Sequence, residues 1–170
     1  QVEALKEKHA KLFAPPKPAR PAPASAVDAG PKVPAQAAKT AVKARFSNTG
    51  QSCISSKRFI VESSVADRFV ALLCEGVAKL KVGNPMDRDC DIGPQARASL
   101  RDDLHAQVER SVASGAKLLM GGHAIDGPGY FYAPTVLDHV TPQMAAGCEE
   151  TFGPVAAVIR VADAEEALRV

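Results

Sequence analysis

A single cysteine with small and cationic neighbours is the part of this sequence that could carry covalent chemistry. Cys53 comes two residues after a Gly50-Gln51 pair, and Lys57 and Arg58 follow it four and five residues later. A thiol attacks a carbonyl carbon only as the thiolate, and nearby positive charge and backbone N–H groups favour that form. The pattern makes Cys53 a candidate nucleophile. The alternative is a buried packing thiol, which is a common role of free cysteines.

Four further motifs follow this cysteine segment along the chain. Together the five resemble, in the same order, the landmarks of the aldehyde dehydrogenase superfamily over residues 36–170. Within that superfamily, residues 57–62 and 100–105 are most similar to bacterial NAD(P)-dependent succinate-semialdehyde dehydrogenases. The five motifs are Phe46-x-x-x-Gly50-Gln51-x-Cys53-x-x-x-x-Arg58, residues 80–85 with 92–94, residues 115–117 with 121–122, residues 132–137, and Glu149-Glu150-Thr151-Phe152-Gly153-Pro154-Val155.

The resemblance implies a role for three residues. Cys53 would attack an aldehyde, for which succinate semialdehyde is the expected substrate, and the resulting thioester would be hydrolysed to the acid. Glu150 would bind the ribose next to the nicotinamide of NAD or NADP, and Phe152 would pack beside the nicotinamide ring. Without the resemblance, Glu149 and Glu150 would be read as solvated charges and residues 152–154 as an ordinary turn. The resemblance implies no metal site.

Composition excludes several classes of partner. The chain has 170 residues and a formal net charge of +2, too little to indicate binding to nucleic acid or to an anionic membrane. No apolar run reaches the ~18 residues of a membrane span. The four cysteines are scattered without a C-x-x-C pair, which argues against a disulfide framework or zinc site and favours a cytoplasmic protein.

The chain divides into two parts of different composition. Residues 1–35 combine a short helix candidate with a Pro/Ala-rich stretch that contains seven of the thirteen prolines, and we expect an extended, disordered linker there. Residues 36–170 alternate helical and strand patterns, which predicts the α/β class with helices packed on a mixed, mostly parallel sheet. By resemblance, residues 36–170 form a partial aldehyde dehydrogenase catalytic domain.

Hydrophobic periodicity and turn residues locate the expected elements. A capping box at Ser64 and Asp67 is expected to start the second helix. His105 is expected to be a surface or partly packed residue, and Cys74 a packing residue. The expected helices cover residues 36–45, 64–82, 95–114 and 162–170, and the expected strands cover residues 58–62, 117–120, 130–137 and 155–161.

Several parts that the resemblance would require are missing from the sequence. There is no G-x-G-x-x-G loop, so we do not expect this chain alone to bind NAD or NADP tightly. The general-base glutamate is also absent. The chain therefore has two readings: an aldehyde dehydrogenase fragment that acts within a larger assembly, or a truncated, inactive remnant that serves at most as a thiol-bearing interaction domain. In both, we expect exposed apolar faces on the two long helices to favour self-association.

Overall fold

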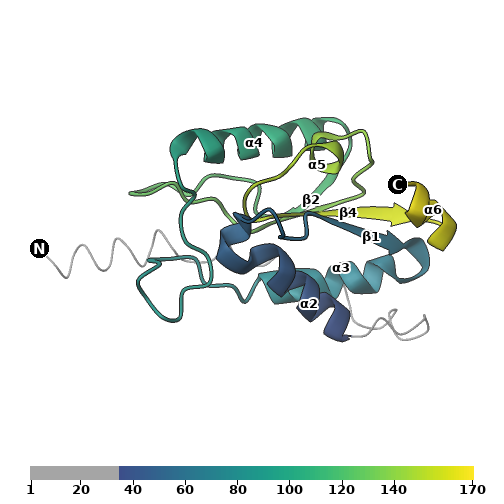
Figure 1. Ribbon diagram of the computed structural model, residues 1–170, viewed down its shortest axis with the longest axis horizontal. Helices are drawn as coiled ribbons and strands as arrows, with labels where there is room; N and C mark the ends of the chain where they lie inside the picture. Colours follow the sequence, from purple (N-terminus) through teal and green to yellow (C-terminus); the bar gives the residue numbers. More distant parts are fainter. Residues whose placement is uncertain (1–34) are drawn as a thin grey trace, which may run out of the picture.

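A four-stranded sheet with helices on both faces organises residues 35–170, the part of the chain that the computed structural model describes (Figure 1). The prediction of a linker in residues 1–35 lies outside the described residues except for Ala35. In chain order the elements are α2 (Ala35–Phe46), η2 (Ser47–Gly50), β1 (Arg58–Glu62), α3 (Ser63–Val77), α4 (Ala98–Ala113), β2 (Lys117–Met120), β3 (Thr135–Asp138), α5 (Ala145–Cys148), β4 (Val155–Val161) and α6 (Ala164–Arg169).

The strands lie in the order β1-β4-β3-β2, and β4 is the centre of the parallel part. Both β1 and β3 run parallel to β4, with Arg58 opposite Ala157 and Thr135 opposite Val155. β2 is an antiparallel edge strand next to β3, and its register shifts between Leu118 and Met120. The predicted α/β class with a mostly parallel sheet is confirmed.

Two apolar cores lie on opposite faces of the sheet, and alternate residues of β4 contribute to each. This explains why β4 is apolar at every position except Arg160 instead of alternating: a strand covered on both faces has almost no solvent side. Figure 1 shows α2 and α3 on one face and α4 with α5 on the other. Val155, Ala157, Ile159 and Val161 pack on the α4 side with Leu104 and Val108, and Ala156 and Val158 pack on the α2–α3 side with Phe69 and Leu73.

The predicted elements are present, but some boundaries were wrong. The capping box at Ser64 is absent, because α3 begins at Ser63 and Glu62 is its N-cap without a side-chain hydrogen bond. The same helix ends at Val77, well before Gly83. The extended stretch expected from residue 130 forms a strand only from Thr135 onwards.

The apolar faces of the two long helices, expected to be exposed, are largely covered in the described residues. Phe69 and Leu73 on α3, and Leu104 and Val108 on α4, are at most 7% exposed, whereas Val112 at the end of the α4 stripe is 38% exposed. Self-association through these faces therefore stays a prediction. No helix of this described part is long and apolar enough to cross a membrane.

Candidate active site at the start of two parallel strands

The segment before Cys53 turns sharply where α2 ends. Asn48, Thr49 and Gly50 are consecutive residues with left-handed backbone angles, at φ 52°, 58° and 69°. Such angles cost energy for side chains other than glycine, and asparagine tolerates them best. The Asn48 side chain also donates a hydrogen bond to the Gln51 carbonyl at 3.1 Å. This local bond explains how the turn is kept.

A loop forty residues away holds the same turn from outside. The Gly93 N–H donates to Thr49 Oγ1 at 3.0 Å. Gln51 makes two bonds to this loop: its Oε1 accepts from the Ala96 N–H at 2.9 Å, and its Nε2 donates to the Pro94 carbonyl at 3.1 Å. The motif at residues 92–94, predicted from resemblance, is thus a support for the turn that leads to Cys53.

The Glu149–Val155 motif lies directly beside the Cys53 motif, because the two segments precede neighbouring parallel strands. Cys53 is five residues before β1, and residues 149–153 come just before β4, which pairs with β1. Gly50 and Gly153 approach so closely that a Cβ on Gly50 would overlap the Gly153 carbonyl. The structure therefore brings together two segments that are about a hundred residues apart in sequence.

Arg45, which sequence reasoning missed as a site residue, links the two segments. Its side chain is completely buried, and it donates to carbonyls of both. An arginine in the last turn of a helix usually reads as a solvated charge near the negative helix end. The overlooked signal is spacing: Arg45 follows Ala38 and Ala41 at helical intervals, and both alanines are buried on the same face of α2.

Lys57 and Arg58, the two cations that follow Cys53, bind different partners. The Lys57 ammonium lies 3.1 Å from the Cys53 carbonyl and 3.2 Å from Glu150 Oε1, so it bridges the two segments. Arg58 instead donates to the Gly147 carbonyl at 2.6 Å. Lys57 is the more relevant cation for the site, since it contacts both Cys53 and Glu150.

Glu149 and Glu150, the two glutamates of the Glu149–Val155 motif, have different environments. Glu149 forms a salt bridge with Arg110 at 2.7 Å and accepts a bond from Gln107 at 3.0 Å. Those hydrogen bonds, from Gln107 and then Arg110, lower the pKa of Glu149. Glu150 is more exposed, with 58% of its side chain accessible beside Lys57. Glu149 thus attaches the motif to α4, while the carboxylate of Glu150 stays accessible; Phe152 is half-buried next to it.

The four cysteines differ in exposure. Cys53 and Cys148 are exposed, and Cys74 and Cys90 are partly buried. Burial, with a smaller contribution from the charge of Asp138, raises the pKa of Cys74 to about 11. Cys74 therefore stays a protonated thiol at neutral pH, as its predicted packing role requires.

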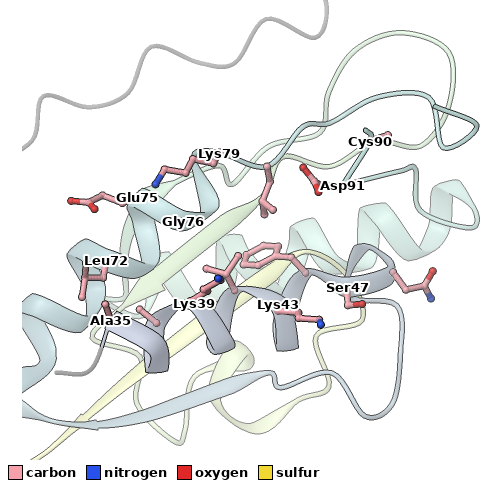
Figure 2. A pocket seen from close by; sticks show the side chains of 15 residues that line it. Ala35, Lys39, Lys43, Ser47, Leu72, Glu75, Gly76, Lys79, Cys90 and Asp91 are labelled. Carbon is pink, nitrogen blue, oxygen red and sulfur yellow. The ribbon is translucent and has the colours of Figure 1, made fainter. Parts of the chain in front are cut away.

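Two other features lie apart from this site. His105 is a partly packed residue whose Nδ1 lies 3.1 Å from the Tyr132 hydroxyl, as expected of a histidine without a catalytic role. A groove of about 670 Å³ between α2 and α3 carries Lys39, Lys43 and Lys79 among its walls but none of the predicted site residues (Figure 2). In the described part of the chain, no group of three or more potential ligands could hold a metal ion.

Comparison with known proteins points to one family. The model of the aldehyde dehydrogenase family matches residues 28–170. A succinate semialdehyde dehydrogenase (NAD(P)+) of Escherichia coli K12 is 51% identical over 132 residues, which cover 78% of this chain and 29% of that protein. A succinate-semialdehyde dehydrogenase (NADP+) of Mycobacterium avium is 50% identical over 135 residues, covering 79% and 29%.

Solved structures agree with the sequence relatives. An NAD-dependent aldehyde dehydrogenase from Sinorhizobium meliloti superposes with a TM-score of 0.77 at 34% identity, covering 79% of this chain and 27% of that one. A lactaldehyde dehydrogenase from Escherichia coli gives 0.76 at 37% identity, covering 78% and 28%. The chain spans less than a third of the length of these relatives. On its sequence match and its fold, the chain belongs to the aldehyde dehydrogenase family.

Proposed function

We propose that this chain is the part of an aldehyde dehydrogenase that carries the nucleophilic cysteine, Cys53, and a portion of the nicotinamide cofactor site. The observation that carries the proposal is the exposed Cys53 on a turn that is fixed against the Glu150 segment. A packing thiol would be covered, as Cys74 partly is. An exposed thiol on a rigid turn can meet a small electrophile without rearrangement of the backbone.

The proposed reaction starts with addition of the Cys53 thiolate to the aldehyde carbon. The carbonyl oxygen then carries the negative charge, and the carbon must lose a hydride to become a thioester. Bound NAD+ or NADP+ would accept that hydride. Water then attacks the thioester carbon, the C–S bond breaks, and the acid leaves while Cys53 returns as thiolate, a good leaving group.

Glu150 and Phe152 are the residues that we assign to the cofactor. The Glu150 carboxylate is accessible and lies on the segment that touches the Cys53 turn, so it suits acceptance of hydrogen bonds from two ribose hydroxyls. Phe152 offers a half-buried ring two residues away. These residues fit the nicotinamide end of the cofactor. The chain has no glycine-rich phosphate loop, so we assign the pyrophosphate to other parts of the enzyme.

The substrate is proposed from the relatives alone. Two curated relatives described above are named as succinate-semialdehyde dehydrogenases. Lys57 and Arg58, the cations that follow Cys53 in sequence, are occupied by the Cys53 and Gly147 carbonyls. We therefore propose succinate semialdehyde as the substrate without assigning a residue to its distal carboxylate.

Thiol labelling of the full chain tests the nucleophile. A limiting amount of iodoacetamide at pH 7.5 should modify Cys53 first, with Cys148 as the equally exposed reference, and peptide mass spectrometry would locate the adducts. Cys53→Ala should remove the fast phase and Cys148→Ala should keep it. Equal rates at Cys53 and Cys148 in the unmodified chain would contradict an activated nucleophile and favour the reading of an inactive remnant.

A chimera tests the complete reaction. Residues 36–170 would replace the matching segment of the Escherichia coli relative, which supplies the rest of the enzyme. We expect NADH or NADPH formation with succinate semialdehyde that Cys53→Ala abolishes and Cys148→Ala leaves in place. A folded chimera without turnover would overturn the assignment of an active segment.

A further inference from the structure

Arg45 is a buried cation whose partners are unusual. Its guanidinium is fully buried, and among the described residues it forms no ion pair with a carboxylate. Its hydrogen bonds all go to backbone carbonyls, and its Nε has no partner. Burying a charge without a counter-ion is costly, so the bonds it makes must compensate.

The carbonyl acceptors come from two separate segments. Nη2 donates to the Gly50 carbonyl at 3.1 Å, and Nη1 lies 3.5 Å from the Ser56 carbonyl; these two residues flank Cys53. Nη2 also donates to the Thr151 carbonyl at 2.9 Å and to the Gly153 carbonyl. Thr151 and Gly153 flank Phe152 and directly follow Glu150. One side chain therefore holds the backbone on both sides of Cys53 and on both sides of Phe152.

We propose that Arg45 is a positioning residue that fixes the Cys53 turn against the Glu150–Gly153 segment. The inference rests on the proposed function of those two segments, and it names a residue that acts on both without touching substrate. The planar guanidinium presents five N–H donors in a fixed fork, so it can hold several carbonyls at set angles. A lysine ammonium in the same place would be a single mobile point charge and could not reach both segments in the same way.

The charge state of Arg45 suits this role at neutral pH. Burial lowers the pKa of Arg45 to about 10, and the negative charge of Glu150 opposes that change. The guanidinium thus remains protonated and keeps all its donors under physiological conditions. The same charge–charge attraction favours keeping Glu150 near the turn.

The distance between Lys57 and Glu150 gives a direct readout of this positioning. Their 3.2 Å ion pair joins the two segments, so a water-soluble carbodiimide should couple the amine to the carboxylate. The Lys81–Asp89 pair at 2.8 Å lies in another loop and serves as an internal reference in the same molecule. Mass spectrometry of the cross-linked peptides gives both initial rates. Their ratio does not depend on the concentration of the carbodiimide or of the protein.

Arg45→Met and Arg45→Lys in the full chain test the inference. We expect the Lys57–Glu150 rate to fall about tenfold relative to Lys81–Asp89 in Arg45→Met, as the loss of a hydrogen bond to a charged donor would produce. Arg45→Lys should keep the fold by circular dichroism but lose a substantial part of the rate. If Arg45→Met does not fold, the folded Arg45→Lys variant decides.

Arg160→Gln is the matched control for lost stability. Arg160 also joins distant segments through charged contacts, but it lies near the other end of β4. We expect this variant to lower the melting temperature and to leave the Lys57–Glu150 rate unchanged. An unchanged rate in a folded Arg45 variant, or an equal fall in Arg160→Gln, would overturn the positioning role.

Iodoacetamide labelling of the same variants separates this inference from the proposed function. Arg45→Lys is compared with the unmodified chain on two counts. If it loses the preference for Cys53 over Cys148 and also shows the slower Lys57–Glu150 cross-link, the positioning role of Arg45 and the nucleophile role of Cys53 are both supported. If the unmodified chain shows no such preference while the cross-link still depends on Arg45, the positioning role stands and the nucleophile assignment fails.

Discussion

The two ends of β4 are each held by an arginine, buried at Arg45 and partly exposed at Arg160, and the two have different partners. Near the carboxyl end, Arg160 makes a two-point contact with Asp138 at 2.7 and 3.0 Å and a further bond to Asp67 at 2.7 Å. Before the amino end, Arg45 binds only backbone carbonyls. The hydrogen bonds that Arg160 donates to Asp138 raise the pKa of Arg160, whereas burial lowers the pKa of Arg45 to about 10.

The difference shows two uses of the same side chain. At Arg160 the carboxylates balance the charge, so the contact stabilises the sheet and α3 against each other. At Arg45 the acceptors are carbonyls of irregular turns, which lack the regular partners of a helix or strand. The second arrangement leaves the charge without a carboxylate partner and joins two turns. We therefore expect contacts at the Arg160 end to act mainly on stability and contacts at the Arg45 end to act mainly on site geometry.

Removing the carboxylate at the stabilising end should have the largest effect on folding. Asp138→Ala leaves the buried part of Arg160 with only the exposed Asp67 as a partner. We expect the free energy of unfolding to fall by roughly 3–4 kcal/mol, as for other broken buried pairs. Urea titration would measure it. Glu165→Ala on the exposed side of α6 is the control. An equally small loss of unfolding free energy in both variants would contradict a stabilising role for the Arg160 end of β4.

Acid should weaken the same end. Burial alone would raise the pKa of Asp138, but hydrogen bonds from Arg160 and the His139 N–H, with their charges, lower it overall. A depressed folded pKa means that this stabilisation is complete above the unfolded pKa of about 3.9 and is lost as pH falls through the lower folded value. The difference in the free energy of unfolding between the unmodified chain and Asp138→Asn should therefore become smaller as pH is lowered below 4. A difference in the free energy of unfolding that stays constant down to pH 2 would refute the role of ionised Asp138.

A methyl group at Gly50 should disturb the site end by steric overlap. Gly50 has φ 69°, and a Cβ there would overlap the Gly153 carbonyl and approach Arg45. We expect Gly50→Ala to cost about 2–3 kcal/mol, from the left-handed angle and the forced separation of the segments. Gly83→Ala is the matched control, because nothing lies within 4 Å of its new Cβ. Similar melting temperatures for the two variants would show that the close approach is unimportant.

Loss of the Gln51 amide should have a smaller effect that is still specific to the turn. Gln51→Ala removes two bonds to the loop at residues 94–96. We expect a loss of about 1–2 kcal/mol and faster hydrogen exchange at residues 50–56. Gln36→Ala, which removes one exposed bond of 3.4 Å, should change neither quantity. Exchange that stays slow at residues 50–56 would argue against support from this loop.

The Lys57–Glu150 pair should contribute least to stability. Lys57 is mostly covered but its partner is more than half exposed, and such pairs contribute below about 1 kcal/mol. Lys57→Gln should therefore lower the free energy of unfolding by about 0.5 kcal/mol, an effect that weakens in 0.5 M salt. A loss above about 2 kcal/mol would place the site end among the main stabilising contacts and remove the contrast with Asp138.

Periodicity and turn residues predicted the fold well because each element has a local signal. The continuous apolar run of residues 155–161 indicated a strand covered on both faces, and that is the position of β4. The boundaries of α3 and β3 were less accurate because they depend on tertiary contacts. Residues 130–134 look extended in sequence, but only residues from Thr135 onwards pair with β4.

The site could be predicted only where resemblance supplied it. Cys53 and Glu150 were selected by motif, but their adjacency depends on β1 pairing with β4, which no local pattern specifies. In open parallel sheets, sites usually lie at the carboxyl ends of strands, whereas both of these segments precede the amino ends. Arg45 was missed because its acceptors are backbone carbonyls, which leave no trace in residue types.

The contacts that set this geometry, the pairing of β1 with β4 included, all lie between Arg45 and Val161. A recombination event that transfers this stretch intact would carry the arrangement into a new gene as one heritable unit. A breakpoint inside it would separate turn from partner even if every individual motif survived. Selection on such rearrangements should therefore act on the interval as a whole, since its parts have no shared geometry when they are inherited separately.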